Sequence, residues 1–508
     1  MDGKYFKPGS NFLLKKCSRR CDGGVDINQL PDEIILVILS NLSLRESVRT
    51  NVLSSRWSDL WKHTPNLKFD RISQLPDEII VLILSFLPLN ESIATSVLSS
   101  RWSNLWKRTP KLNFNTNLLK INGGNPIPVR GRWHVESWKY LEMVSSVLQS
   151  HKAPSLKEIK ISLCVSKSAR FLVAKWLEFV FSRKVGRLEL DFLCEEATRM
   201  VDLNELFRDK NIYGCLQDLI AFKSLKRLSL KCVKVGGEAI RLFLCNCPLL
   251  QQLFIHRAVL TSGVEVCGMT PRLKHLDICS CTVQDYVNGE SSIKVSAPNL
   301  TWLRVDATSQ KLSLENIPKL IRGDYTFTSP SPDYSKNFAS AVFSCISQLR
   351  ILNLNLLYPE VFLANAFPRM PKLKKLIVRY NGTYAHGLLP LTALIWAAPR
   401  LQEFELEFVD TAKDSTTRQK EGITKAKRCP HPHLKVLKFT GFYAFDDAHI
   451  KLLTYIIDNC VALEKIIIGC SPVYGFMYDL DHDSPVIKAR VRQRASWQNT
   501  RSHSTTLC

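Results

Sequence analysis

The segment ISQLPDEII (residues 72–80) repeats the earlier INQLPDEII (27–35), and the heptapeptide VLSSRWS occurs at both 52–58 and 97–103. These matches belong to a duplication in which residues 26–70 are followed, without a linker, by a second copy at 71–115. Thirty of the 45 paired positions are identical. Such a repeat indicates one small structural unit that is present twice. A unit of this size is too short to be an enzyme by itself.

The second copy is predicted to fold as a compact group of helices. Pro76 suits the first position of a helix, and Asp77 and Glu78 follow in the first turn, where the helix dipole favours acidic groups. Pro88 ends this helix. Three apolar runs recur at helical spacing: Leu75, Ile79, Ile80, Ile83, Leu84, Phe86 and Leu87; then Ile93, Val97 and Leu98; then Trp102, Leu105 and Trp106. So short a unit cannot bury this much apolar surface, and an exposed apolar face usually marks a partner site.

The motifs LPDEI (75–79), SFLP (85–88) and SVLSSRWSNLW (96–106) together resemble the F-box of plant proteins. The resemblance implies docking onto a Skp-type adaptor that is joined to a cullin scaffold in a ubiquitin ligase. The alternative is a helical hairpin with an ordinary core. The implied adaptor contacts are Leu75, Pro76, Ile79, Ile83, Leu84, Leu87, Pro88, Val97, Leu98, Trp102, Leu105 and Trp106 in the second copy, and Leu30, Pro31, Trp57 and Trp61 in the first.

The two copies differ at positions that matter for packing. The first copy has Asn41 and Ser43 where the second has Phe86 and Pro88. Exchanging a buried Phe for Asn loses roughly 2–3 kcal/mol of apolar burial. We therefore expect the second copy to be the main docking unit and the first to be weaker or redundant.

The composition is that of a globular chain of two or more domains, with 508 residues, 45% hydrophobic and 23% charged. The sequence contains no run of about 18 apolar residues, so we do not expect a membrane span. The first 25 residues are basic and polar and do not resemble a secretory signal. Sixteen scattered cysteines are therefore interpreted as reduced thiols, which favours a nuclear or cytoplasmic protein.

The net charge of +23 raises the alternative of a nucleic-acid-binding protein. The basic residues are spread along the chain, however, without a zinc-finger spacing or an aromatic RNA-binding signature. Local clusters occur at Lys15–Arg20, Arg418–Arg428 and Lys488–Arg494 and are interpreted as loops and tails. We do not expect a nucleic-acid partner or a membrane partner.

From about residue 150 the dominant pattern is Leu-x-x-Leu-x-Leu, at a spacing that is most often in the twenties, which is typical of leucine-rich repeats. The pattern predicts an irregular solenoid with one long face. A closed α/β domain is the alternative. The repeats begin at Leu156, Ile159 and Ile161, and continue at Leu225, Leu228, Leu230; Leu250, Leu253, Ile255; Leu273, Leu276, Ile278; Leu300, Leu303, Val305; Leu349, Leu352, Leu354; Leu373, Leu376, Val378; Leu401, Phe404, Leu406; Leu434, Leu437, Phe439; and Leu463, Ile466, Ile468.

Strand alternation then predicts which side chains face outward along the sheet. Early repeats present Arg227, Ser229, Lys231, His275, Asp277, Trp302, Arg304 and Asp306, and later ones Lys375, Arg379, Glu403, Glu405 and Glu407. A basic strand beside an acidic strand can recognise a charged partner. The candidate substrate-binding residues are Arg227, Trp302, Arg304, Lys375, Arg379, Glu403 and Glu405.

The segments CPHPHLKVLKFTGF (429–442) and YIIDNCVALEKIII (455–468) resemble the FBD module that ends plant F-box proteins with leucine-rich repeats. The predicted fold is a multidomain α+β or α/β chain, with small helical F-box units before an irregular leucine-rich-repeat solenoid. Its expected parts are a disordered basic segment (1–25), the F-box copies (26–70 and 71–115), the solenoid (116–424), the FBD module of terminal repeats (425–480) and a disordered basic tail (481–508).

Signatures of catalysis are missing. There is no Walker loop and no Gly-x-Ser-x-Gly motif, and the final residues have the wrong order for prenylation. Cys429, His431 and His433 lack a second ligand pair at short spacing, and we interpret them as a turn that enters a strand. The pairs Cys245/Cys247 and Cys279/Cys281 are expected to pack as small apolar residues. We expect no metal and no cofactor.

The resemblance to plant F-box proteins with leucine-rich repeats implies a non-catalytic substrate-recognition subunit of an SCF-type ubiquitin ligase, which would hold the adaptor through its F-box and an unknown protein target through its repeats. Tethering raises the effective concentration of the target near a ubiquitin-loaded enzyme. The alternatives are a protein-interaction scaffold without ligase activity and, in another class, a basic nucleic-acid-associated protein, whose binding would weaken steeply with salt.

Overall fold

The computed structural model describes residues 31–40, 57, 60, 75–97, 101–115, 133–193, 197–208, 223–267, 272–283, 292–307, 311–329, 331–359, 362, 367–381, 388–409, 430–441, 447–469 and 504–507. Leu30, Trp61, Leu98, Cys429 and the three basic clusters lie outside these ranges, as do the predicted basic segment 1–25 and most of the predicted tail 481–508. The chain divides into two units, Met1–Thr109 and Pro110–Cys508.

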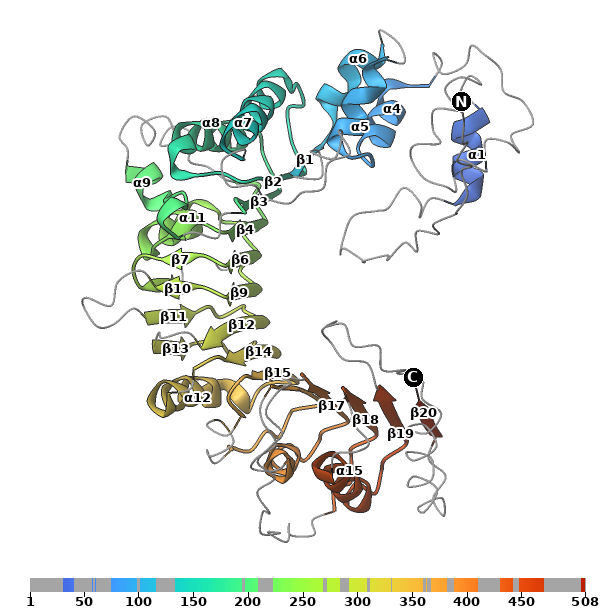
Figure 1. The fold of residues 1–508 in the computed structure, drawn as a ribbon, viewed down its shortest axis with the longest axis vertical. Coiled ribbons are helices and arrows are strands. Elements are labelled where there is room, and N and C mark those ends of the chain that lie inside the picture. Colours follow the sequence, from blue (N-terminus) through green and yellow to red (C-terminus); the bar gives the residue numbers. More distant parts are fainter. Residues whose placement is uncertain are drawn as a thin grey trace, which may run out of the picture. The chain divides into compact units, whose positions relative to one another are not determined.

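The first unit is helical, as the sequence predicts. Pro76 stands at the N-cap of α4, whose first turn carries Asp77 and Glu78. Pro88 lies at the N-cap of α5, so it begins the next helix, whereas α4 already ends at Leu84. The described helices are α1 (Asp32–Ser40), α4 (Asp77–Leu84), α5 (Leu89–Ala94) and α6 (Trp102–Leu105), with the short 3₁₀ turns η5 (Thr95–Val97) and η6 (Trp106–Arg108) (Figure 1).

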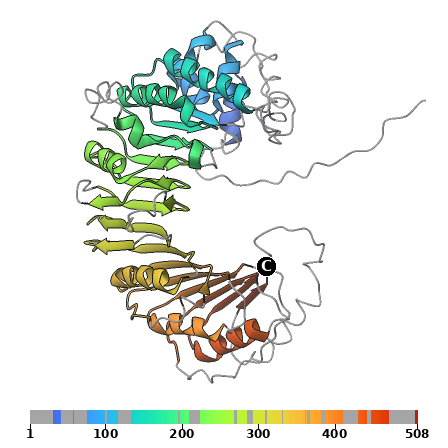
Figure 2. The same ribbon diagram turned by 60° about the vertical axis from the view of Figure 1, so that its left-hand side comes forward.

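The second unit is built on one 14-stranded parallel sheet, whose strands lie side by side in the order in which they occur in the chain. The numbers missing from this order belong to the short strands of two side sheets. Figure 2 shows the strands stacked one after another. They are β1 (Lys111–Asn115), β2 (Glu158–Ser162), β3 (Arg187–Asp191), β4 (Arg227–Lys231), β6 (Gln252–His256), β9 (His275–Cys279), β12 (Trp302–Ala307), β14 (Arg322–Phe327), β15 (Ile351–Leu356), β16 (Lys375–Tyr380), β17 (Glu403–Phe408), β18 (Val436–Thr440), β19 (Lys465–Gly469) and β20 (Ser504–Leu507).

All aliphatic and aromatic residues of the predicted repeat pattern are buried, from Leu156 to Ile468. The pairing register aligns Leu228 with Leu253 and Leu276, and it aligns Leu230 with Ile255. Two continuous apolar columns therefore run along the inner face of the sheet, each strand burying its leucines against those of its neighbours. The predicted open solenoid is confirmed, and a closed α/β domain is not formed.

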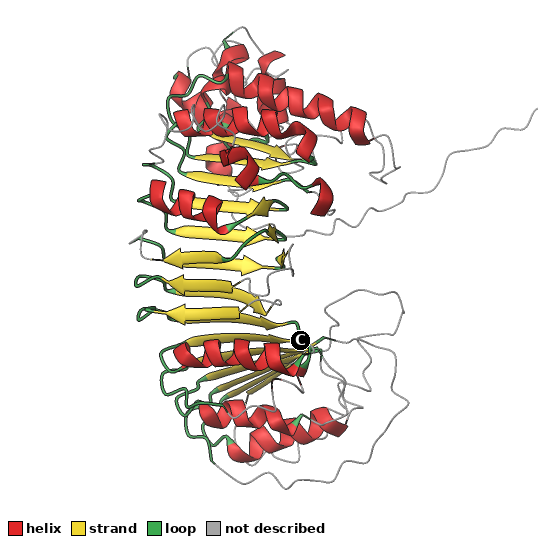
Figure 3. Cartoon of the chain, turned by 90° about the vertical axis from the view of Figure 1, so that its left-hand side faces the viewer, coloured by secondary structure: helices red, strands yellow, loops and turns green. Residues whose placement is uncertain are grey.

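The second layer lies along one side of the sheet and changes along the chain (Figures 1 and 3). Near the ends it consists of helices, and in the middle two three-stranded parallel sheets replace them. The helices are α7 (Trp133–Ser150), α8 (Arg170–Ser182), α9 (Leu203–Arg208), α11 (Gly237–Asn246), α12 (Pro332–Ile346), α14 (Thr392–Ala397) and α15 (Asp447–Asn459). The small sheets are β5 (Lys234–Val235), β7 (Val259–Leu260) and β10 (Thr282–Val283), and β8 (Val264–Cys267), β11 (Ser292–Ser296) and β13 (Lys311–Glu315).

The structure adds strands that the pattern search overlooked. Strand β1 lies within the predicted second F-box copy (71–115), yet it pairs with β2 and belongs to the second unit, which begins at Pro110. Strand β14 carries Gly323 and Tyr325 where other strands carry two leucines, which hides it from a search for aliphatics. Long gaps between predicted repeats are therefore partly filled by repeats of unusual sequence.

Strand β20 differs from the prediction of a disordered tail. Ser504–Leu507 pairs in parallel with Lys465–Ile468 of β19. The outer edge of β19 would otherwise present unpaired backbone groups, and a β-branched Thr-Thr pair suits an added strand. Within the described ranges, no helix combines the length and the apolar character that crossing a bilayer requires.

Candidate interaction sites

The first candidate site is an apolar pair on the leading helix of each F-box copy. On α4, Ile79 and Leu82 are 43% and 51% exposed. Their counterparts on α1, 45 positions earlier, are Ile34 and Val37, which are 47% and 59% exposed. The other apolar positions of the two helices also correspond, since Ile80 and Leu84 are buried, as are Ile35 and Leu39. Both helices therefore divide their apolar residues in the same way between a core face and an outer face.

The predicted adaptor contacts separate into surface and core residues. Leu75, Pro76, Ile79, Ile83, Leu87 and Pro88 are exposed or half-buried in the second copy, and Pro31 is exposed in the first. Leu84, Trp102, Leu105, Trp106 and Trp57 are instead buried. In this structure these five side chains belong to the buried interior, and their role as adaptor contacts stays a prediction. Leu82 and Val37 are not among the predicted contacts, although both are exposed at equivalent positions of the two copies.

An ion pair joins the LPDEI and SSRWS motifs of the second copy. Arg101, from the SSRWS motif, donates hydrogen bonds of 2.6 and 2.9 Å to Oδ1 of Asp77, from the LPDEI motif, and a further bond of 2.6 Å to the carbonyl of Leu75. Arg108 reaches the other carboxylate oxygen of Asp77 at 3.2 Å. The side chains are about one third exposed, so the pair is a modest contribution to stability. It fixes the start of α4 against α6.

The second candidate site is the outer face of the long sheet. Alternation places the predicted outward residues on this face, in rows that the strand register defines. One row contains Arg227, Gln252, His275, Trp302 and Arg322, which follow each other across five strands. The predicted orientation of Arg227, Trp302, Arg304, Lys375, Arg379, Glu403 and Glu405 is therefore confirmed, while their role in binding remains a prediction.

The charges on β16 and β17 are largely engaged with each other. Nζ of Lys375 lies 2.7 Å from Glu403 and 3.8 Å from Glu405, and Arg379 pairs with Glu407. Lys438 of β18 also binds Glu405, at 2.6 Å. These side chains are neighbours across paired strands, a contact that sequence spacing alone does not reveal. A partner that reads this part of the face has to compete with internal ion pairs.

The aromatic residues of the face gather around Trp302. The ring centroid of Trp302 lies 5.4 Å from that of His275 and 6.3 Å from that of Phe254, both in edge-on arrangements. Arg227 stacks over Phe254 at 4.4 Å, and Arg322 lies 5.6 Å from the Trp302 ring. Cation–π contacts of this kind hold flat groups in place at a surface. We call Arg227, Phe254, His275, Trp302 and Arg322 the aromatic patch.

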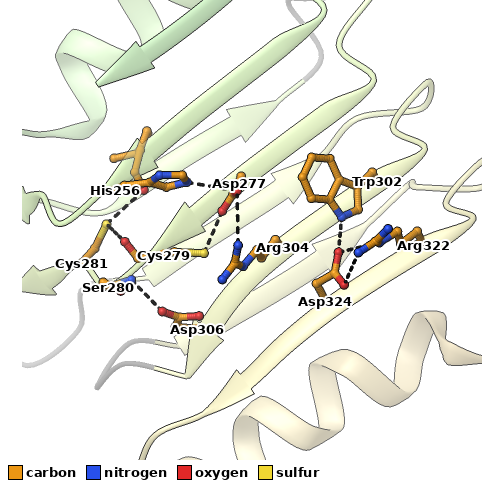
Figure 4. A network of polar contacts seen from close by, with 11 residues as sticks. His256, Asp277, Cys279, Ser280, Cys281, Trp302, Arg304, Asp306, Arg322 and Asp324 are labelled. Atoms are coloured by element: carbon orange, nitrogen blue, oxygen red, sulfur yellow. Dashed lines mark hydrogen bonds and ion pairs between the residues drawn. The ribbon is translucent and has the colours of Figure 1, made fainter. Parts of the chain in front are cut away.

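Beside the aromatic patch lies a network of buried carboxylates (Figure 4). Asp277, Asp306 and Asp324 all belong to the outer face, yet each is buried. Asp324 accepts hydrogen bonds from the indole N–H of Trp302 and from the guanidinium of Arg322, whose Nε lies 2.8 Å away. Oδ2 of Asp306 accepts a 2.6 Å hydrogen bond from the backbone N–H of Ser280.

Asp277 is the centre of this network. Its Oδ1 lies 2.7 Å from Sγ of Cys279, and its Oδ2 lies 3.0 Å from Nε2 of His256 and 4.0 Å from Nη1 of Arg304. Burial alone would raise the pKa of Asp277, but the contacts with His256 and Cys279 and the nearby positive charges outweigh it and hold the pKa below its ordinary value. Burial, followed by the charges of Asp306 and Asp277, raises the pKa of the Cys279 thiol.

The other predicted cysteine and histidine positions are structural. Both ring nitrogens of His431 contact backbone groups, with Nε2 3.0 Å from the carbonyl oxygen of Ala398 and Nδ1 accepting from the N–H of Leu434. This agrees with a turn that enters β18. Cys247 and Cys281 are buried as expected, and burial raises the pKa of Cys281 to about 12, whereas Cys245 is exposed. Cys279 departs from the expectation, because it belongs to the polar network.

Comparison with known proteins identifies the chain. The family described as "At1g61320/AtMIF1, LRR domain" matches residues 147–484. The chain belongs to this leucine-rich-repeat family. The F-box domain matches twice, at residues 27–69 and 72–114, so both copies of the duplication are F-boxes.

Relatives from Arabidopsis thaliana share this combination. F-box/FBD/LRR-repeat protein At2g04230 is 28% identical over 456 residues, which cover 86% of this chain and 87% of the relative. FBD-associated F-box protein At3g52670 is 26% identical over 463 residues, covering 88% and 89%. F-box/LRR-repeat protein At3g26922 is 27% identical over 327 residues, covering 61% and 85%. The resemblance to plant F-box/FBD/LRR-repeat proteins is confirmed, and the combination of domains supports a substrate-adaptor role in general.

Proposed function

We propose that this chain is the substrate-recognition subunit of an SCF-type ubiquitin ligase. Its F-box would bind a Skp-type adaptor that is attached to a cullin, and the outer face of its sheet would bind a target protein. Ubiquitin transfer would be carried out by other subunits, in the nucleus or the cytoplasm. The observation that carries the proposal is the pair of exposed apolar residues that recurs at equivalent positions on α1 and α4.

The energetics support a docking role for this pair. Fully burying an Ile or Leu side chain contributes roughly 1.5–3 kcal/mol, and Ile79 and Leu82 are each about half exposed in the unbound chain. Covering both with a partner would therefore contribute about 1.5–3 kcal/mol, or roughly 10- to 150-fold in affinity. Without a partner, these two large apolar side chains of α4 stay partly exposed to water, and the free energy that their burial would contribute is not gained.

The experiment is co-purification of the full chain with a Skp-type adaptor and a cullin from plant extract. We expect Ile79→Asp/Leu82→Asp to abolish recovery of both. Val461→Asp, which changes an equally exposed apolar residue in the other unit, is the matched control and should retain them. If the α4 variant still recovers the adaptor as efficiently as this control does, the proposed docking face is wrong.

The first F-box is tested in the same way with Ile34→Asp/Val37→Asp. We propose that the second copy is dominant, and we therefore expect this variant to lose little adaptor. Phe86, one reason for the proposed ranking, is only half-buried, so its replacement by Asn41 in the first copy weakens that copy less than full burial would suggest. Loss of adaptor with the α1 variant and retention with the α4 variant would reverse the ranking.

For the target, we propose that the aromatic patch is the centre of recognition. It combines flat apolar surface with two arginines, the composition of energetically important contacts in protein interfaces. The charged rows on β16 and β17 would contribute specificity once their internal pairs open. Trp302→Ala should reduce target capture from proteasome-inhibited tissue more than Glu405→Lys does. If both variants capture the same proteins as the wild type, the target binds elsewhere.

Target abundance separates a ligase from a scaffold. Loss of this chain should raise the level of a captured target if the chain directs its degradation. A target that is captured through the aromatic patch but keeps its abundance would contradict the ligase proposal and support the scaffold alternative.

A further inference from the structure

Three side chains of different chemistry converge on the outer face of the sheet. Nε2 of His256, the carboxylate of Asp277 and Sγ of Cys279 supply one ligand atom each, and these atoms all lie within 4.8 Å of one another. We propose that His256, Asp277 and Cys279 bind a zinc ion. The proposal goes beyond the adaptor function and does not depend on it.

The strand register creates this convergence. His256 ends β6 and lies directly opposite Cys279, which ends the neighbouring strand β9. Asp277 precedes Cys279 by two residues, and residues two apart on a strand share a face. All three ligands therefore stand on two adjacent, rigid strands, which is the kind of support that a precise metal site needs.

His256 and Cys279 both contact the carboxylate of Asp277. Nε2 of His256 lies 3.0 Å from Oδ2 of Asp277, yet it has no hydrogen bond of acceptable geometry. Sγ of Cys279 lies only 2.7 Å from Oδ1 of the same carboxylate, which is short for a sulfur atom. A zinc ion bound at about 2.0–2.3 Å from each atom would occupy the point that they surround after small side-chain shifts.

Burial also favours a ligand role. Asp277 is 2% exposed and Cys279 is 6% exposed, although both belong to the outer face of the sheet. A buried carboxylate is costly unless it is paired or coordinates a metal. The imidazole of His256 is about one quarter exposed, so the ion could enter from the solvent side of that ring.

The donor set selects the metal. Thiolate sulfur, imidazole nitrogen and carboxylate oxygen are the usual ligands of zinc, whereas magnesium and calcium prefer oxygen alone. Binding would form Zn–S, Zn–N and Zn–O bonds and would break the S–H bond of Cys279, whose proton passes to solvent. No oxidation or reduction takes place.

Asp306 is a candidate for the fourth ligand. It follows Val305, which pairs with Ile278, the residue before Cys279, so it stands beside the thiol on the neighbouring strand. Its Oδ2 accepts from Ser280, but its Oδ1 is buried without a hydrogen-bond partner. A water molecule is the other possible fourth ligand.

Arg304 opposes the metal. Its Nη1 lies 4.0 Å from Oδ2 of Asp277, and a guanidinium at that distance repels a divalent cation. The side chain is 45% exposed, which leaves it room to turn toward solvent when the ion enters. Zinc should therefore bind more tightly to Arg304→Gln than to the wild type. A network that serves only for ion pairing predicts the opposite, a loss of stability with no gain in zinc binding.

Two nearby residues provide matched controls. Cys281 lies two residues after Cys279, but its sulfur contacts the carbonyls of Ile255 and Cys279 and not the carboxylate. His275 lies on the same strand as Asp277 and contacts Gln252 through Nδ1. Cys281→Ser and His275→Gln therefore remove a thiol and an imidazole close to the site without removing a proposed ligand.

The experiment measures zinc bound to the purified full chain by elemental analysis after dialysis against zinc and then against buffer. One zinc ion per chain is expected for the wild type, Cys281→Ser and His275→Gln. Cys279→Ser and His256→Gln should lose zinc, with affinity reduced by about 100-fold or more. Absence of zinc from the folded wild-type chain, or equal retention in all five proteins, overturns the proposal.

Cobalt provides a readout that does not depend on the folding of a variant. Adding Co²⁺ to the wild-type chain should produce the near-ultraviolet absorption of a cobalt–thiolate bond, and zinc should displace it. No such absorption, with the chain folded by circular dichroism, contradicts a Cys279 ligand. Loss of the absorption in Cys281→Ser but not in Cys279→Ser would show that Cys281, and not Cys279, binds the metal, and this result would also overturn the proposed site.

Discussion

Replacing Gly323 by Ala should destabilise the solenoid at a single repeat. Gly323 lies on β14 at a position where neighbouring strands have leucine, such as Leu303 and Leu352. A Cβ atom added here would meet the ring of Tyr325, with Cζ and Oη only 2.9 Å away and Cε2 closer still. Tyr325 is fully buried, so its ring cannot swing aside into solvent.

The expected cost follows from the packing around that ring. The Tyr325 ring lies 6.2 Å from the ring of Phe338, and its hydroxyl contacts Sγ of Cys345 at 3.5 Å. Overpacking of a filled core costs typically about 1–3 kcal/mol. We expect Gly323→Ala to lower the free energy of unfolding by about 2 kcal/mol, measured by urea denaturation of the full chain followed by circular dichroism.

A second substitution turns this into a test of cause. Tyr325→Leu introduces the residue that the neighbouring strand β15 has at this position, Leu354, and should make Gly323→Ala nearly neutral, giving an interaction energy of about 2 kcal/mol in a double-mutant cycle. Gly469→Ala is the control, because its added Cβ would meet Thr440 at an ordinary 3.4 Å. Equal effects of Gly323→Ala and Gly469→Ala, or additive effects in the cycle, would refute the proposed exchange of space between Gly323 and Tyr325.

Three further outcomes are expected. Leu354→Ala, at a fully buried position of an inner column, should cost about 3 kcal/mol in the same denaturation assay. Burial acts to raise the pKa of Glu189, but hydrogen bonds and charges from Lys231 and Lys160 outweigh it, so the pKa is lowered in the folded chain. The ionised carboxylate therefore stabilises the fold above about pH 4.3, and this stabilisation is lost as the pH falls through the lower pKa of the folded state. In urea titrations from about pH 6 to about pH 3, the free energy of unfolding should fall less for Glu189→Gln than for the wild type. A cycle of Asp77→Ala and Arg101→Ala should give a coupling of about 1 kcal/mol in thermal unfolding of the chain, and additive losses would show that the pair is not a clamp.

Sequence reasoning identified the inner face of the sheet more reliably than the outer face. Inward leucines obey one local rule, and all of those predicted are buried. The repeat pattern did not predict strand β14, because Gly323 and Tyr325 stand where the neighbouring strand β15 has Leu352 and Leu354. The ring of Tyr325 occupies the space that a side chain at position 323 would need. No local pattern describes such an exchange, since it depends on the packing of residues two positions apart.

The outer face depends on contacts between strands, which a sequence pattern does not contain. Glu405 and Lys438 are 33 residues apart in the chain but bind each other across adjacent strands. His256 and Cys279 likewise meet only through the register of β6 and β9. Ligand spacing within a single segment therefore drew attention to Cys429 and His431 and missed the group formed by two strands.

The duplication shows the same limit in the helical unit. Periodicity placed Leu84 and Trp102 on an apolar face, and the structure buries both inside the unit. Leu82, two residues before Leu84 on the same helix, is by contrast exposed. Helical spacing indicates which residues can share a face, whereas the neighbouring helices decide which part of that face stays open.

Strand-by-strand stacking has an evolutionary consequence. Each strand of the long sheet is bonded only to the one before it and the one after it. Gain or loss of a whole repeat would therefore disturb two junctions and leave distant ones untouched. An added repeat would lengthen the outer face of the sheet by one strand, so the number of repeats, as well as single substitutions, can change the size and shape of that face.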